Sequence, residues 1–245
     1  MDTLKDRINR YWTRRAPSFA EQRTRELFSE KHDRWLREFD RWLPRDRKLD
    51  ILDIGTGTGF FALLLAERGH RVTGIDLSEE MIRYAKESAE QAGAEAVFRV
   101  MDAERPDFAP GSFDAIVSRN LTWALPHLEE AYAAWGRLLR PGGVLINFDA
   151  DYCRRTADAV DAETELPENH AHKQVAQELI DENDQITLEL SAYQQARPQW
   201  DVSLLLDAGF ERVTVDVGVW TRIYNEKDEF YNPAPIFTIA AYRPE

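Results

Sequence analysis

The residues with the clearest chemical potential form a glycine-rich run, LDIGTGTGFF, at 52–61. Gly55, Gly57 and Gly59 lie between an apolar strand-like run and an apolar helix-like run, where open α/β sheets bind their ligands. Glycine permits positive φ angles there and lets backbone N–H groups come close to a ligand. The run therefore predicts a binding loop at the carboxyl edge of a parallel sheet.

The glycine spacing alone leaves the ligand open. Gly57, Gly59 and Ala62 match the G-x-G-x-x-A spacing of a dinucleotide site, with Asp76 as the acid that follows. A strand–helix turn without a ligand is a further alternative. Asp53 stands just before the glycines, where a carboxylate repels a pyrophosphate and attracts an ammonium group. Asp53 therefore favours a cationic amino-acid ligand with a sulfonium centre.

The segments around this loop alternate between strand and helix patterns. Strands are expected at 49–54, 71–75, 96–101, 113–118 and 144–148, and helices at 60–67, 79–92 and 129–139. Because these strands are apolar on both faces, they predict a parallel sheet covered by helices on both sides. A helix at 200–208 and strands at 212–220 and 236–242 follow, and they place one antiparallel strand at the sheet edge. The expected fold is thus an α/β sheet of seven strands.

Two amphipathic helices are expected before the sheet. Apolar residues recur at helical spacing from Leu4 to Trp12 and again from Phe28 to Leu43, with Pro17 separating the two stripes and Pro44 ending the second. We interpret 1–245 as a single domain. Its expected parts are an N-terminal helical cap (1–48), a cofactor-binding core (49–150), a substrate-side insertion (151–197) and a closing helix with strands (198–245).

The composition excludes several classes of protein. The 245 residues carry a net charge of −13, which argues against a general binder of nucleic acid or anionic membranes. A single cysteine, Cys153, excludes a disulfide framework and a cysteine-rich zinc site. No apolar run reaches the length of a membrane span, and the N-terminus lacks a signal-peptide core. We expect a cytoplasmic monomer or homodimer with no membrane anchor and no nucleic-acid partner.

Five successive segments resemble the motifs of a known family. LDIGTGTG, VTGIDLSEEMI, VMDAE, FDAIVSRN and LLRPGGVLINFD look like those of the class I S-adenosylmethionine-dependent methyltransferases, over about residues 49–150. The resemblance is to the small-molecule branch called methyltransferase type 11 or the UbiE-like group. It implies a Rossmann-like, mostly parallel seven-stranded sheet with its last strand antiparallel. It also implies S-adenosyl-L-methionine as cofactor, S-adenosyl-L-homocysteine as product, and direct methyl transfer to N, O, S or C of a small molecule.

The resemblance assigns roles on the cofactor side. Asp53 and the backbone of Gly55 and Gly57 hold the methionine part. Asp76 accepts both ribose hydroxyls, and Leu77 packs on the adenine. Asp102 accepts from the adenine amino group, and Asn120 lies where the methyl group meets the substrate. The remaining residues on this side are Tyr11, Thr56, Gly59, Met81, Met101 and Ala103.

The substrate side is less defined. In related enzymes the N-terminal helix folds over the cofactor as a lid, and polar-aromatic residues are expected near the opening. They are Trp12, Phe19, Trp123, Asp151, Tyr152 and Tyr193. The candidate catalytic residues are Asn120, Asp149 and His127. A general base is needed only if the nucleophile arrives protonated, and Asp149, Asp151 and His127 are the candidates for that role. Glu168, His170 and His172 could form a metal cluster, but a further well-spaced ligand is missing from the sequence, so no metal site is expected.

Three other functions remain open from the sequence. A tRNA or rRNA methyltransferase is supported only by the basic stretch 1–48, with 14 Lys/Arg against 9 Asp/Glu. An NAD-dependent dehydrogenase fits the glycine spacing, and a non-enzymatic regulator could retain the cofactor pocket without the chemistry. SRNLTW after the fourth strand replaces the Asn/Asp-Pro-Pro-Tyr/Phe pattern, which weakens adenine or glutamine N-methylation.

Overall fold

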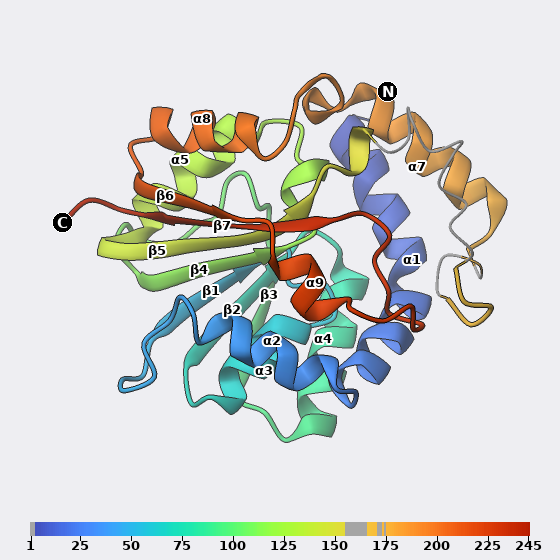
Figure 1. The fold of residues 1–245 in the computed structure, drawn as a ribbon, viewed down its shortest axis with the longest axis horizontal. Helices are drawn as coiled ribbons and strands as arrows, with labels where there is room; N and C mark the ends of the chain where they lie inside the picture. The colour runs from blue at the N-terminus through green and yellow to red at the C-terminus, as the bar shows by residue number, and fades with distance from the viewer. Residues whose placement is uncertain (1–2, 155–165, 171–172, 174) are drawn as a thin grey trace.

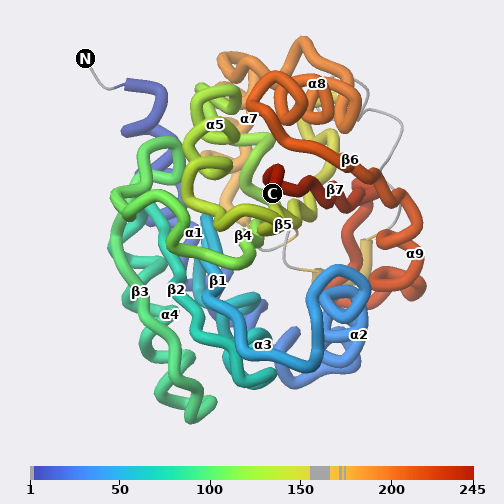
Figure 2. The backbone as a smooth tube through the Cα atoms, turned by 90° about the vertical axis from the view of Figure 1, so that its left-hand side faces the viewer, coloured from blue at the N-terminus to red at the C-terminus, as the bar shows by residue number. Residues whose placement is uncertain are grey.

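A seven-stranded sheet forms the centre of the structure, a computed structural model that describes residues 3–154, 166–170, 173 and 175–245. Within these residues the strands lie in the order β3-β2-β1-β4-β5-β7-β6 (Figure 2). Their bounds are β1 Asp50–Ile54, β2 Arg71–Asp76, β3 Ala96–Val100, β4 Phe113–Arg119, β5 Leu139–Ala150, β6 Glu211–Asp216 and β7 Ile236–Tyr242. Strand β7 runs antiparallel to both β5 and β6, and the other pairs are parallel. The predicted fold class is confirmed.

Helices cover both faces of this sheet (Figure 1). On one face lie α2 Lys31–Phe39, α3 Phe60–Glu67, α4 Glu79–Ala92 and α9 Val219–Ile223; on the other lie α5 Leu128–Leu138 and α8 Gln199–Asp207. Helix α1, Leu4–Leu27, crosses the carboxyl edge of the strands, and α7, Gln177–Glu189, lies outside it. Short 3₁₀ turns occupy Thr122–Ala124 and Ser191–Gln194. No helix of the described ranges is long and apolar enough to cross a membrane.

Two apolar cores result, one on each face of the sheet. Trp35 packs edge-on against Phe61 and Phe148 at ring distances of 5.0 and 5.2 Å, which fastens α2 to α3 and β5. On the opposite face Tyr132 and Trp135 of α5 are fully buried against the sheet. Edge-to-face ring pairs add stability beyond the area that they bury. Both cores hold the strands in a fixed register, and thereby fix the edge at which their carboxyl ends meet.

The helix after β2 begins and ends as its sequence predicts. Ser78 accepts a hydrogen bond from the Met81 amide at 3.3 Å, and Gly93 closes the helix in the left-handed region. The capping oxygen satisfies one of the amides that a helix start leaves free, and acidic residues in the first turn complement the helix dipole. The sequence therefore fixes the path of the chain just beyond Asp76.

The expected break at Pro17 is wrong. Helix α1 continues through Pro17 to Leu27, and the chain turns only at residues 28–30. Proline removes one N–H from the helical ladder, but Pro17 is exposed, and the adjacent turns pack on α4 and α7. Tertiary packing therefore outweighs the local cost. Phe28, expected in the second apolar stripe, is 77% exposed instead.

A second correction concerns the expected strand at 212–220. Strand β6 stops at Asp216, and the chain turns into α9 at Val219. Asp216 accepts from the Gly218 amide at 2.8 Å and pairs with Arg222 at 2.6 Å. This Asp-centred turn redirects the chain, and the buried Val219 and Ile223 then pack in the core with α2.

The basic α1 and the acidic α7 face each other. Arg7 pairs with Glu182 at 3.0 Å and also with Glu189, and Arg14 pairs with Glu178 at 3.4 Å. These exposed pairs contribute little stability individually. They do neutralise part of the N-terminal positive charge within the chain, which weakens the only support for an RNA substrate. Much of the acidic insertion, including 155–165 and His172, lies outside the described residues.

Candidate cofactor-binding site

A cavity of about 290 Å³ lies at the carboxyl ends of β1, β2 and β4, against one face of α1. Most of the residues expected at the site contribute to its wall. They are Tyr11, Trp12, Phe19, Asp53, Gly55, Thr56, Gly57, Asp76, Leu77, Met81, Asp102, Ala103, Asn120, Trp123 and Tyr152. A concave, partly apolar space with a few placed polar groups is typical of small-molecule sites. The topology thus brings segments from the first 152 residues to one place.

The glycine loop follows a path that only glycine adopts easily. Gly55 and Gly57 have φ angles of 68° and 54°. A Cβ on Gly55 would lie 2.7 Å from a methyl group of Leu121, well inside contact distance. The Thr56 amide donates to the Ile75 carbonyl at 2.9 Å, which ties the loop to β2. Glycine is therefore required both by the turn and by the close approach of the next loop.

Asp53 lies at the end of β1 and is 2% exposed. Its Oδ2 accepts from Thr56 Oγ1 at 2.6 Å and from the Ala62 amide at 3.1 Å. Its Oδ1 accepts no hydrogen bond within the described part of the chain, and the residue lines the cavity. Burial raises the pKa of Asp53 to about 7. The carboxylate is thus held rigidly and has one oxygen available for a cationic group.

Asp76 ends β2 and contacts two segments of the loop region. Its Oδ2 accepts from the Gly57 amide at 3.0 Å, and its Oδ1 accepts from the Ser78 amide at 2.9 Å. Each carboxylate oxygen has a second lone pair for a further donor. Burial raises the pKa of Asp76 to about 6. The side chain can therefore accept two hydroxyl hydrogen bonds in a fixed orientation.

Lys5 is a cavity residue that the sequence did not indicate. Its Nζ donates to Asp102 Oδ2 at 2.8 Å and also pairs with the buried Glu104. Thr13, further along α1, lies 2.9 Å from the capping hydroxyl of Ser78. Both contacts join α1 to the loops after β2 and β3. Because Lys5 and Asp102 are 97 residues apart, no local pattern could have paired them.

Two of the three candidate catalytic residues lie away from the cavity wall. Asp149 is fully buried, accepts from the Trp123 amide at 3.0 Å and from Thr122, and pairs with Arg197 at 3.4 Å. Asp149 therefore holds the loop of Trp123 and is not among the residues that line the cavity. His127 is exposed at the start of α5 and contributes nothing to the wall. Only Asn120 of the three lines the cavity.

Four more expected residues lie outside the wall. Gly59 is the cap of α3, and an added Cβ would lie 3.2 Å from Phe98. Met101 packs at the edge of the α5 core. Asp151 accepts from the Arg154 and Arg197 amides, and Tyr193 packs beside α7. These four residues therefore contact neighbouring elements of the fold and do not line the cavity.

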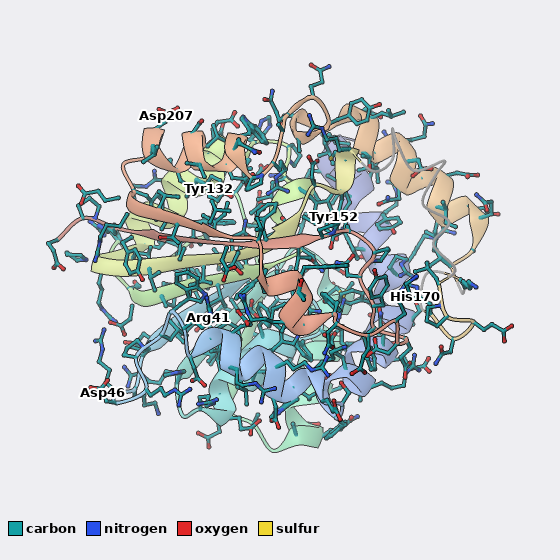
Figure 3. All side chains as sticks on the ribbon, viewed as in Figure 1. Arg41, Asp46, Tyr132, Tyr152, His170 and Asp207 are labelled. Carbon is teal, nitrogen blue, oxygen red and sulfur yellow. The ribbon has the colours of Figure 1, made fainter. Side chains whose placement is uncertain are left out.

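A chain of polar side chains crosses the cavity wall beyond β4 and β5. Tyr152 donates to Asn120 Oδ1 at 3.0 Å and accepts from Asn232 Nδ2 at 2.7 Å. In Figure 3 Tyr152 lies at the end of β5, toward α1. Burial raises the pKa of Tyr152, which keeps its hydroxyl protonated at neutral pH. Asn120 has a positive φ of 53°, unusual for a residue other than glycine. The hydrogen bonds from Asn232 to Tyr152 and from Tyr152 to Asn120 therefore fix the orientation of the Asn120 side-chain amide.

A family comparison agrees with this geometry. Residues 51–143 match the family model described as a methyltransferase domain, over the segment that supplies Asp53, Asp76 and Asp102. This segment of the chain is similar to the methyltransferase domain. The chain is 38% identical over 98 residues to the phosphatidylethanolamine N-methyltransferase of Cereibacter sphaeroides, covering 39% of this chain and 48% of that protein. It is 35% identical over 94 residues to the ubiquinone biosynthesis O-methyltransferase of Dechloromonas aromatica, covering 38% and 40%.

Solved structures extend the likeness to the whole fold of the chain. Phosphoethanolamine N-methyltransferase 2 of Haemonchus contortus, in complex with phosphomonomethylethanolamine and S-adenosylhomocysteine, superposes with a TM-score of 0.66 and 18% identity. That alignment covers all of this chain and 61% of the other. The chain spans about half or less of the length of the curated relatives described above. The likeness at low identity concerns the fold, and the shared sequence concerns the segment around the cavity.

Proposed function

We propose that this protein transfers a methyl group from S-adenosylmethionine to a small-molecule acceptor by direct displacement. The observation that carries the proposal is the cavity in which the buried Asp53 and the half-buried Asp76 flank a glycine loop of positive φ. A dinucleotide is disfavoured because Asp53 lies where its pyrophosphate would approach. The methyltransferase domain match at 51–143 supports the same cofactor.

The residues of the cavity fit each part of this cofactor. Asp53 has a free carboxylate oxygen for the ammonium group, and Asp76 has acceptors for the two ribose hydroxyls. Asp102, Leu77 and Met81 supply an acceptor and apolar surface for the adenine. When bound, the cofactor supplies a methyl group on a positively charged sulfur that leaves as a neutral thioether. The protein then has to position the acceptor and exclude water.

Asn120 and Tyr152 are proposed to position the acceptor. Both line the cavity, and the Tyr152 hydroxyl fixes the Asn120 amide so that its Nδ2 can donate to a ligand. The relatives are named for N- and O-methylation, which favours a nitrogen or oxygen acceptor. The proposal is tested by calorimetry with S-adenosylhomocysteine and with NADH. Binding of NADH without binding of S-adenosylhomocysteine would contradict it and support the dehydrogenase.

Asp76→Ala is expected to weaken S-adenosylhomocysteine binding by about 1–3 kcal/mol, the range for losing a charged hydrogen-bond partner. The reason is the loss of the acceptor for both ribose hydroxyls. The measurement is calorimetric titration at pH 8, with the exposed Asp207→Ala on α8 as the control. An unchanged affinity for Asp76→Ala would remove the ribose assignment.

Cofactor binding is expected to protect α1 from proteolysis. Helix α1 lines the cavity and is joined to the loops after β2 and β3 by Thr13 and Lys5, so a ligand between them adds contacts to both. Trypsin cleavage after the exposed Arg10 and Arg14 should slow by about threefold or more with saturating S-adenosylhomocysteine, as local opening becomes rarer. Mass spectrometry of the fragments measures it. Equal rates with and without the ligand would count against a lid.

A further inference from the structure

Three arginines line the cavity and form what is here called its guanidinium side. Arg15 and Arg23 come from α1, and Arg119 comes from the end of β4. Lys5, the remaining cavity lysine, is already paired with Asp102 and Glu104. The cavity wall therefore carries guanidinium groups as well as the carboxylates that are proposed to hold the cofactor.

A single buried carboxylate balances two of these arginines. Glu26, which is fully buried, pairs with Arg119 Nη2 at 2.8 Å and also with Arg23. Trp35 Nε1 donates to the same carboxylate at 3.1 Å. These partners lower the pKa of Glu26 to about 2 despite its burial, so it remains ionised. One negative charge thus faces two positive charges, and Arg15 is a third.

Arg15 has no carboxylate partner in the described ranges, although it is only 6% exposed. Its Nη1 donates to Ser18 Oγ at 2.9 Å, and its Nε is buried with no acceptor among the described residues. Nη1 of Arg119 is likewise buried without an acceptor there, while the side chain stacks on Trp35 at 4.4 Å. The preceding Arg14, in contrast, is exposed and pairs with Glu178.

Buried charges without partners cost free energy, and a bound anion supplies both the missing charge and the missing acceptors. The three guanidinium groups exceed Glu26 by two charges. The carboxylate of the proposed cofactor offsets one of them at most, and its sulfonium adds a positive charge. Arg15 Nε and Arg119 Nη1, which have no acceptor among the described residues, therefore remain as donors for the second ligand.

We propose that the methyl acceptor is a small organic anion, whose carboxylate or phosphate group is bound by Arg15 and Arg119. This inference rests on the proposed methyl transfer, and it assigns the acceptor a charge. The anion faces the guanidinium side of the cavity, and the nucleophilic atom of the same molecule lies toward Asn120. Arginine suits this role, because its planar fork binds oxyanions with two parallel hydrogen bonds.

The test uses the full-length protein saturated with S-adenosylhomocysteine and three amine probes of similar size. Glycine carries a carboxylate, phosphoethanolamine carries a phosphate, and ethanolamine carries neither. We expect calorimetry to show that one of the two anionic probes binds at least tenfold more tightly than ethanolamine. The probe that binds more tightly identifies the oxyanion. Failure of both anionic probes to bind, or equal binding of ethanolamine, would overturn the inference.

Variants assign the effect to the arginine. Arg15→Gln should lower the affinity for the anionic probe at least tenfold, and Arg15→Lys should retain more of that affinity. The affinity of Arg14→Gln should stay within about twofold of the parent. Thermal melting of each variant checks that it folds. Loss of probe binding by Arg14→Gln as large as that by Arg15→Gln would overturn the assignment.

A separate comparison distinguishes the acceptor from the cofactor as the source of the anion. S-adenosylhomocysteine has the amino-acid carboxylate, and 5′-methylthioadenosine lacks it. If Arg15→Gln lowers the affinity for S-adenosylhomocysteine tenfold and leaves the affinity for 5′-methylthioadenosine unchanged, Arg15 binds the cofactor carboxylate and the inference fails. If the parent protein binds no S-adenosylhomocysteine, the proposed function itself fails. If it binds S-adenosylhomocysteine but neither anionic probe, only the inference about the acceptor fails.

Discussion

Replacing Arg197 with methionine is expected to lower the free energy of unfolding by about 3–5 kcal/mol at neutral pH, the range for removing one member of a buried ion pair. Arg197 is fully buried between Asp149 and Asp201, which are also fully buried. It donates to both oxygens of Asp201 at 2.6 and 2.9 Å and lies 3.4 Å from Asp149. Methionine fills similar space but leaves both carboxylates without this cation. Urea or thermal unfolding measures the change.

The decrease in the free energy of unfolding caused by Arg197→Met should depend on pH. Burial raises the pKa of Asp149 in the folded protein, and the positive charge of Arg197 opposes that rise. Without Arg197 the folded pKa rises further above the unfolded value, so the destabilisation grows as pH increases through that window. The variant should therefore differ from the parent more at pH 7.5 than at pH 5. Arg154→Met, at an exposed arginine, is the control and should stay within about 0.5 kcal/mol. A loss below about 1 kcal/mol for Arg197→Met would contradict the argument.

The same cluster contacts the loop that carries Trp123. Arg197 Nη2 donates to Thr122 Oγ1 at 2.6 Å, and Asp149 accepts from the Trp123 amide. The pair thus holds residues 122–123 in place, and Trp123 lines the cavity. Asp149 and Arg197 are positioning residues, and their removal should alter ligand binding through this loop.

The elements around the cofactor site were predictable because their signals are local. Ser78 and Gly93 bound α4, and the glycine run with Asp53 marks the end of β1, each within a few residues of the element that it defines. A capping hydroxyl and a left-handed glycine act by short-range sterics and hydrogen bonding, which a single sequence displays. The parallel sheet then brings Asp53, Asp76 and Asp102 together without further information.

The guanidinium side of the cavity could not be predicted in the same way. Glu26 and Arg119 are 93 residues apart, and Arg15 looks like any basic residue of an amphipathic helix until its burial is known. Pro17 was misleading, because its local cost predicted a break that the packing of α1 overrides. Charge patterns in a sequence do not say which charges are buried, and that burial is what separates Arg15 from Arg14.

The affinity for S-adenosylhomocysteine is expected to fall as pH decreases from 8 to 5. The pKa of Asp53 is raised to about 7 by burial, and the ammonium group that it is proposed to bind favours its ionised form. Below pH 7 the protein must first release a proton from Asp53, which costs about 1.36 kcal/mol per pH unit, or tenfold in affinity. Through Asp53 alone the affinity at pH 5 should be about 100-fold weaker than at pH 8, and protonation of Asp76 adds to this loss. Calorimetry in buffers of different ionisation enthalpy measures both the affinity and the proton released.

Asp53→Asn separates this effect from unfolding. The asparagine oxygen can still accept from Thr56 and Ala62, so the loop is retained while the charge is lost. In the parent the folded pKa of Asp53 lies above the unfolded value of about 4, so stability falls as pH rises between them. The variant should therefore gain stability at pH 8, by an amount on the order of 1–3 kcal/mol, while its affinity for the nucleoside falls at least tenfold. Its affinity should also change less with pH, with the remainder due to Asp76, whose pKa is about 6. A variant that binds S-adenosylhomocysteine as tightly as the parent at pH 8, with the same pH dependence, would show that Asp53 does not face the ammonium group.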